Sequence, residues 1–222
     1  MVPEMFLSGF LSYHAKFLED EELQRATETA MGLPIVRDRA DIVQGTPCLL
    51  YKPPVRVHGQ DRNQQRHVGF FGLPGVTPYA YSGQVASRQD IPDWLERILA
   101  AVNALLGTEL NAVLVNRYED GSQYIGAHQD SERGLVRGAP VVTITLGEPR
   151  KFRIRRKEDG RRVLDLTPAH GSLLVMHHQR GYTHEIPVQK TIRAPRVPNP
   201  VRVSLTLRQH LLLQAPAAAA LP

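Results

Sequence analysis

The sequence predicts an α+β protein, mainly β, whose core is a double-sheet barrel of the jelly-roll type. Beyond residue 107 the chain divides into short apolar runs, which turn residues separate about every eight to twelve positions. Before that point, two longer segments repeat their apolar residues at helical spacing. Because 222 residues are enough for one sizeable core, we expect a single domain in which both helices buttress one sheet.

The two predicted helices are residues 19–31 and 90–106. In the first, Leu23, Ala26 and Ala30 share one face, and acidic residues occupy the first turn, where they suit the helix dipole. In the second, apolar residues recur at helical spacing between an early proline and a closing glycine. Both patterns favour helices whose apolar faces pack on a sheet.

Short segments with the composition of strands fill the second half of the chain. They are residues 111–118, 140–146, 151–156, 161–166, 171–176 and 202–208. Residues 157–160, Lys-Glu-Asp-Gly, supply a hairpin turn between two of them. We therefore place the domain at residues 1–213 and its jelly-roll core at about 108–210. The Ala- and Pro-rich tail, residues 214–222, is expected to be disordered.

Composition excludes several classes of protein. Cys48 is the only cysteine, so neither an intrachain disulfide nor a cysteine-rich zinc site can form. No apolar run approaches the ~20 residues that span a bilayer, and residues 1–18 lack the pattern of a signal peptide. We therefore expect an intracellular protein with no membrane partner, and a monomer. The net charge of +5 is compatible with a nucleic-acid partner.

Three residues form a candidate metal site. His128 and Asp130 are two positions apart, which on a strand places both side chains on the same face. A third ligand has to come from a distant strand, and His184 is the best candidate, with His177 and His178 as alternatives. Two imidazoles and one carboxylate on one face of an octahedron leave three positions open, as in non-heme Fe(II) oxygenases.

The segment 202–208 adds a second chemical group. Arg202 and Arg208 lie on the same side of the predicted strand, with Ser204 and Thr206 between them. A buried guanidinium needs a partner, and a dicarboxylate such as 2-oxoglutarate supplies one. Structural salt bridges to nearby carboxylates are the alternative. Together with the metal ligands, the pattern indicates an iron enzyme that activates O2 with an organic acid.

Residues 47–89 differ from the rest of the chain. They combine arginines and aromatic residues with many prolines and glycines. Positive charge interleaved with rings suits a nucleic-acid surface, because charge binds phosphates and rings stack on bases. The alternative is a long hairpin excursion whose aromatic residues only pack against the domain.

Several ordered motifs resemble one known family. They are residues 116–121, 128–132, 142–147, 150–152, 169–176, 184–187 and 202–208. From about residue 56 to residue 208 the sequence resembles the AlkB family of Fe(II)/2-oxoglutarate-dependent nucleic-acid dealkylases, in particular its animal-type DNA repair members and their bacterial relatives. The resemblance implies a double-stranded β-helix core with an N-terminal nucleotide-recognition lid at about 47–89.

The resemblance also implies roles for individual residues. The iron ligands are His128, Asp130 and His184, and Arg208 belongs to the same catalytic group because it braces Asp130. The 2-oxoglutarate pocket is formed by Asn116, Tyr118, Arg202, Ser204, Thr206 and Arg208. The substrate-binding residues are Tyr81, Tyr79, Glu132, Arg66, His58 and Phe71.

Within that last group, Tyr81 is expected to sandwich a flipped base against His128, with Tyr79 and Glu132 near the base edge and Arg66 at the pocket rim. His58 takes the place of an aromatic finger that fills the gap left in a duplex. Histidine fills less space than phenylalanine, so repair of duplexes is expected to be less efficient.

The activity implied is oxidative demethylation of 1-methyladenine and 3-methylcytosine in DNA, with Fe(II), 2-oxoglutarate and O2, releasing formaldehyde, succinate and CO2. The protein would be cytoplasmic if bacterial and nuclear if eukaryotic. The alternatives are an RNA demethylase, a protein or small-molecule hydroxylase with the same iron core, and a non-catalytic binding module. A second departure from the family is Tyr182, where relatives tend to have tryptophan.

Overall fold

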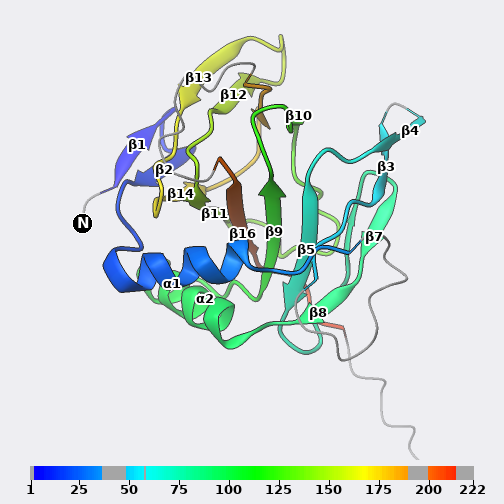
Figure 1. Ribbon diagram of the computed structural model, residues 1–222. Coiled ribbons are helices and arrows are strands. Elements are labelled where there is room, and N and C mark those ends of the chain that lie inside the picture. Colours follow the sequence, from blue (N-terminus) through cyan, green and yellow to red (C-terminus); the bar gives the residue numbers. More distant parts are fainter. Residues whose placement is uncertain (1–2, 37–48, 58, 190–199, 214–222) are drawn as a thin grey trace, which may run out of the picture.

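The computed structural model describes residues 3–36, 49–57, 59–189 and 200–213. Its centre is a large sheet of eight strands that faces a smaller sheet of four (Figure 1). The large sheet runs in the order β1 (Glu4–Phe6), β2 (Leu11–His14), β14 (Leu173–Met176), β11 (Val141–Gly147), β16 (Arg202–Arg208), β9 (Ala112–Tyr118), β5 (His67–Gly72) and β8 (Arg88–Asp90). The small sheet runs in the order β10 (Ile125–His128), β15 (Tyr182–Ile186), β12 (Phe152–Arg156) and β13 (Arg162–Leu166).

Helices α1 (Asp20–Met31) and α2 (Asp93–Leu106) lie side by side on the outer face of the large sheet (Figure 1). The main core cluster joins Ala26 and Ala30 of α1 and Leu95 of α2 to apolar residues of the central strands. The predicted mainly-β jelly roll with two buttressing helices is confirmed. The second helix starts at Asp93 rather than at residue 90, because residues 88–90 pair with β5 as strand β8.

Alternation along β16 separates the core from the site. Val203, Leu205 and Leu207 belong to the core cluster that includes the helices, while the even-numbered side chains face the small sheet. Strand β16 lies between β11 and β9 and pairs with each of them over most of its length. Its polar face is therefore held rigidly at the centre of the barrel.

The region 47–89 is only partly a separate lid. Strands β5 and β8 belong to the large sheet, and β5 pairs with β9 along its whole length. Two hairpins stand apart from that sheet: β3 (Pro54–Val57) with β4 (Gln60–Asn63), and β6 (Tyr79–Tyr81) with β7 (Gln84–Ala86). A nucleotide-recognition lid, if restricted to these hairpins, stays a prediction. Neither described helix is long and apolar enough to cross a membrane.

Candidate active site

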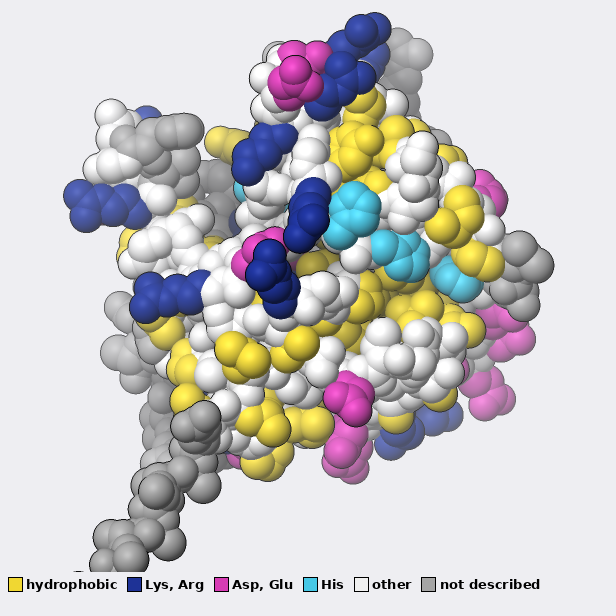
Figure 2. Space-filling view, turned by 180° about the vertical axis from the view of Figure 1, so that it is seen from behind, with side chains coloured by type: hydrophobic (Ala, Val, Ile, Leu, Met, Phe, Trp, Pro, Cys, Tyr) yellow, Lys and Arg dark blue, Asp and Glu magenta, His cyan; other side chains and the backbone are white. Residues whose placement is uncertain are grey.

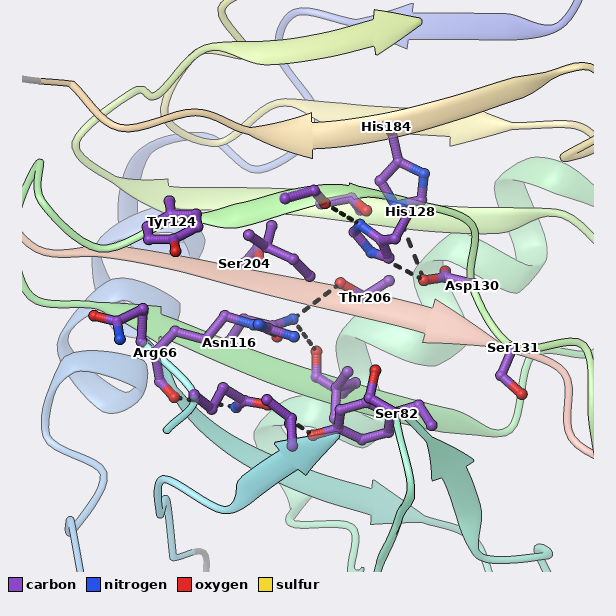
Figure 3. Close-up of a pocket in the computed structure, with 18 of the residues that line it drawn as sticks. Arg66, Ser82, Asn116, Tyr124, His128, Asp130, Ser131, His184, Ser204 and Thr206 are labelled. Carbon is purple, nitrogen blue, oxygen red and sulfur yellow. Dashed lines mark hydrogen bonds and ion pairs between the residues drawn. The ribbon is translucent and has the colours of Figure 1, made fainter. Parts of the chain in front are cut away.

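A cavity of about 860 Å³ opens between the two sheets. We call it the central cavity. Strands β9 and β16 form one wall, β10 and β15 another, and the β6 hairpin closes a third side (Figure 3). All the residues that the sequence assigned to the iron and to 2-oxoglutarate lie along these walls.

His128, Asp130 and His184 meet at one end of the central cavity, and we call them the metal cluster. His128 ends β10 directly opposite His184 on β15, so pairing of the two strands brings the rings to 4.3 Å between centroids. Asp130 Oδ1 lies 3.8 Å from His128 Nε2 and 3.9 Å from His184 Nε2 (Figure 3). One potential ligand atom from each residue lies within 4.8 Å of the others.

The strand argument for His128 and Asp130 was wrong in one respect. Asp130 lies two residues beyond the end of β10, so strand alternation does not place it. The alternative third ligands lie elsewhere. His177 shares a hydrogen bond of 2.8 Å with Ser12 Oγ, and the ring of His178 packs edge-on against Phe10. Within the described residues, neither belongs to a potential metal-binding group.

Arg208 fixes the carboxylate of Asp130. Its Nε and Nη2 donate to Oδ2 at 3.0 and 2.7 Å, which leaves Oδ1 facing the two imidazoles. Burial by itself would raise the pKa of Asp130, but Arg208 and the two histidines outweigh it and hold that pKa well below its usual range. Asp130 is therefore an anion at neutral pH, as a metal ligand has to be.

The two histidines of the metal cluster are neutral at neutral pH because burial, which the nearby charges outweigh at Asp130, dominates at both of them. Burial, with a smaller contribution from His128, lowers the pKa of His184 to about 3. Burial also lowers the pKa of His128, although Asp130 partly opposes it. Neutral imidazoles keep the nitrogen lone pairs that bind a metal, so the residues present fit Fe(II) without a change of protonation.

Arg202 marks the other end of the same strand face. Its side chain is 1% exposed, and within the described residues its Nε and Nη1 have no hydrogen-bond partner. Nη2 lies 3.5 Å from Thr145 Oγ1, and the guanidinium lies over the Tyr118 ring at 5.3 Å. Burial lowers its pKa to about 10, so it stays charged at neutral pH. These unpaired donors suit a carboxylate.

The alternative of structural salt bridges thus holds for one arginine and fails for the other. Arg208 pairs with Asp130, whereas Arg202 has no carboxylate partner among the described ion pairs. Ser204 and Thr206, which lie between them, are buried and line the central cavity. The four side chains form one polar row, as the sequence predicted.

Asn116 joins that row to the substrate side of the cavity. It lies opposite Ser204 in the β9–β16 register, and its Nδ2 is 3.4 Å from Thr206 Oγ1. Arg66 Nε donates to Asn116 Oδ1 at 2.7 Å. Arg66 is 7% exposed and lines the central cavity, and its predicted place at the pocket rim stays a prediction.

Tyr79 and Tyr81 form an aromatic wall in the central cavity. Their rings stack at 5.1 Å between centroids, and the Tyr81 hydroxyl donates to Gln64 Oε1 at 3.3 Å. Burial raises the pKa of Tyr79 to about 12 and also raises that of Tyr81. Both hydroxyls therefore stay protonated at neutral pH. The Arg208 guanidinium lies over the Tyr79 ring, 4.8 Å from its centroid, so the wall joins the metal cluster through this cation–π contact.

Two of the predicted substrate residues that the structure describes, Phe71 and Glu132, do not lie at this wall. Phe71 is fully buried in the core cluster on the helix side of β5. Side chains alternate along a strand, so its neighbour Phe70 faces the other side and belongs to a different cluster. Its assignment to the substrate is therefore corrected to a core role. Glu132 is exposed and lines a neighbouring depression, not the central cavity. His58 lies outside the described residues.

Two residues that the sequence did not single out support the site. Arg150 is buried and donates to the carbonyls of Asp120, Gly121, Gln123 and Pro187, which joins the turn before β10 to the end of β15. In the sequence, only its place in the motif 150–152 indicated that Arg150 belongs near the site. Gln179 binds the segment that carries Asp130, and no sequence pattern indicated it.

The fold and the site define a class of protein: a non-heme metal enzyme built on a double-stranded β-helix, with three potential metal ligands and, at the other end of the same cavity, a buried arginine whose free donors suit a carboxylate. A model of the 2OG-Fe(II) oxygenase superfamily matches residues 11–208. The chain belongs to this superfamily. Membership and the donor set together support Fe(II), 2-oxoglutarate and O2, the cofactors expected from the sequence.

Curated relatives narrow the resemblance to the AlkB type. The chain is 38% identical over 167 residues to the DNA oxidative demethylase ALKBH2 of Homo sapiens, covering 71% of this chain and 61% of that protein. It is 37% identical over 166 residues to ALKBH2 of Mus musculus, covering 71% and 66%. The predicted family resemblance is confirmed, and the chain spans less than two thirds of the length of these relatives.

Solved structures agree on the fold. The structure of OsALKBH1 superposes with a TM-score of 0.61 at 19% identity, covering 94% of this chain and all of that one. A 2OG-Fe(II) oxygenase from Burkholderia pseudomallei gives a TM-score of 0.55 at 15% identity, covering 92% and 87%. At these identities the likeness concerns the fold alone.

Proposed function

We propose that this protein is an Fe(II)- and 2-oxoglutarate-dependent dioxygenase that removes N-methyl groups from damaged bases in DNA. One observation carries the proposal: the metal cluster, the unpaired Arg202 and the stacked rings of Tyr79 and Tyr81 all line one cavity. The first suits Fe(II), the second a dicarboxylate and the third a planar base.

The protein's own groups would divide the work of binding. The metal cluster offers three ligands and leaves three octahedral positions for co-substrates. Arg202 would hold the carboxylate of 2-oxoglutarate that does not reach the metal, with Tyr118 beneath the guanidinium. When bound, Fe(II) and 2-oxoglutarate supply oxidation by O2, which yields succinate and CO2 and releases the methyl carbon as formaldehyde.

The aromatic wall and the surface charge support a nucleic-acid substrate. A base has to leave its stack to reach the metal, and rings in the pocket offset part of that cost, which is a few kcal/mol. Tyr79 and Tyr81 supply such rings. On the face seen in Figure 2, Lys and Arg side chains extend from the left edge through the centre to the top, where they can meet phosphates.

DNA is the proposed substrate because curated relatives that are 37% and 38% identical to this chain are named DNA oxidative demethylases. We propose 1-methyladenine and 3-methylcytosine as the lesions. RNA is the alternative. A monomer acting inside the cell, in the cytoplasm of a bacterium or the nucleus of a eukaryote, fits this substrate.

The test is demethylation of matched oligonucleotides. The protein is incubated with Fe(II), 2-oxoglutarate and 3-methylcytosine in single-stranded DNA, duplex DNA or RNA, and formaldehyde and succinate are quantified. We expect formaldehyde from DNA in proportion to succinate, and none with Asp130→Ala. Faster turnover of the RNA would favour the alternative substrate. Succinate without formaldehyde from any oligonucleotide would refute a nucleic-acid substrate and leave a hydroxylase.

A further inference from the structure

Asp130 differs from the two histidines in how its backbone is held. His184 lies inside β15, between β10 and β12, and His128 is the last paired residue of β10. Asp130 follows two positions later, where no strand pairing fixes the chain. A metal site tolerates deviations of only about 0.2 Å in its ligand distances. Asp130 therefore needs support that the sheet does not give.

Part of that support comes from Arg208, which holds the outer carboxylate oxygen of Asp130. The backbone is held from another direction. Gln179, in the segment between β14 and β15, accepts a hydrogen bond from the Asp130 backbone N–H through Oε1 at 2.6 Å. One residue thus fixes the side chain of Asp130 and the other fixes its main chain.

The contact with Gln179 is reciprocal. The Gln129 side chain donates through Nε2 to the backbone carbonyl of Gln179. Lys157 Nζ in turn donates to Gln129 Oε1 at 2.8 Å, which uses the remaining acceptor of that amide. Gln129 and Gln179 are both half-buried. The result is a clamp between the two segments that lead to Asp130 and to His184.

We propose that Gln179 is a positioning residue of the metal site, whose amide oxygen sets the place of Asp130 relative to the two histidines. Partners behind metal ligands typically contribute 10- to 100-fold to metal affinity. Gln179 Oε1 accepts a hydrogen bond from the Asp130 backbone N–H, so its contribution passes through the backbone of Asp130. The inference rests on the proposed function only in requiring that a divalent metal fills the cluster.

The experiment measures Co(II) binding by the full chain, with affinity from calorimetry and coordination from the visible d–d absorption. Gln179→Met keeps the length of the side chain and removes the acceptor; Gln179→Glu keeps an acceptor oxygen. Arg180→Met is the matched control, since within the described residues this exposed neighbour in the same segment makes no hydrogen bond or ion pair with the metal cluster.

We expect Gln179→Met to weaken Co(II) binding about 10- to 100-fold and to change the d–d spectrum. Gln179→Glu and Arg180→Met should keep the wild-type spectrum and bind at least half as tightly. Unchanged affinity and spectrum in Gln179→Met would overturn the inference and leave the proposed function standing. The same holds if Gln179→Met lowers only the melting temperature. Failure of the wild-type protein to bind Co(II) would instead overturn the metal site itself.

Discussion

The two ends of the central cavity hold similar groups in opposite states of charge balance. At the metal end, Arg208 is 3% exposed and paired with Asp130 through two hydrogen bonds, and only its Nη1 has no hydrogen-bond partner within the described residues. At the other end, six residues earlier on the same strand face, Arg202 is 1% exposed and has two nitrogens without partners within the described residues. We call these the metal end and the acid end.

The difference shows at which end the protein neutralises the buried arginine with a carboxylate of its own. A buried guanidinium without a carboxylate lowers the stability of the fold, because burial removes its hydration and no ion pair compensates for that loss. The metal end avoids most of this cost through Asp130. The acid end bears it until a ligand binds, so ligand binding there should stabilise the fold more than contact area alone predicts.

The largest expected effect follows from breaking the balanced end. Asp130→Ala removes a metal ligand and leaves Arg208 as a buried, unpaired charge. We expect turnover and Co(II) binding to be lost and the free energy of unfolding of the metal-free protein to fall by about 3–5 kcal/mol. Succinate assays, calorimetry and denaturant titration measure the three quantities.

A matched control is Asp165→Ala. Asp165 is also paired with arginine, Arg153, but at the surface of the small sheet and away from the central cavity. Its loss should leave Co(II) binding unchanged and cost about 1 kcal/mol or less. Retained Co(II) binding by Asp130→Ala would show that the metal cluster is assigned to the wrong residues.

A substitution at the acid end should raise the free energy of unfolding, whereas Asp130→Ala at the metal end lowers it. Arg202→Met removes a buried charge that has no carboxylate partner within the described residues, so the ligand-free protein should become about 1–3 kcal/mol more stable. Binding of 2-oxoglutarate should weaken about 100-fold, and Co(II) binding should not change. Thermal melts with and without 2-oxoglutarate separate the two effects. A less stable ligand-free variant would mean that the contacts of Arg202 with Thr145 and Tyr118 already offset the cost of burying its charge.

The parts that the sequence predicted share a physical basis. Each predicted element repeats its apolar residues at the spacing of a helix or a strand, because one of its faces packs in the core between the helices and the large sheet. These elements are helices α1 and α2 and strands β9, β11, β14 and β16. The candidate site was predicted because the metal ligands and the two arginines are chemically unusual residues at fixed spacing on or beside such strands. Periodicity also placed Arg202 and Arg208 on one face correctly.

The parts that the sequence could not predict depend on loop paths. Asp130 lies beyond the end of strand β10, so the path of the following loop sets its position in the metal cluster. Its backbone N–H is bound by Gln179, which is 49 residues away in the sequence. No periodic pattern encodes such a contact. Phe71 was misassigned because two adjacent phenylalanines on β5 face opposite sides, and composition alone does not say which side is the core.

Lowering the pH should weaken the metal end and leave the acid end unaffected. His184 has a pKa of about 3 in the fold and about 6.5 when unfolded, so the unfolded chain binds more protons between these values. Its stabilising contribution is therefore complete above pH 6.5 and falls as the pH drops toward 3. For the metal-free protein we expect this residue alone to remove about 2 kcal/mol of stability between pH 7 and pH 5.

Unfolding titrations at several pH values test this. His184→Leu should flatten the pH profile by about the same 2 kcal/mol, whereas Arg202→Met should keep the wild-type slope, because Arg202 does not titrate in that range. A wild-type slope in His184→Leu would mean that His184 is already protonated in the folded, metal-free protein, and that the metal end is less balanced than its geometry indicates.

The smallest effect concerns how Tyr118 contributes to the acid end. Its ring lies 5.3 Å from the Arg202 guanidinium, and its side chain is 2% exposed. We expect the Tyr118 hydroxyl to donate a hydrogen bond to bound 2-oxoglutarate. Tyr118→Phe keeps the ring and removes only that hydroxyl, so KM for the co-substrate should rise about 2- to 10-fold, with kcat unchanged. Tyr118→Leu removes the ring as well and should raise KM further, because Arg202 then loses its cation–π contact. Equal KM values for Tyr118→Phe and the wild type would assign the whole contribution of Tyr118 to the ring, and would leave Arg202 as the main side-chain donor to the acid.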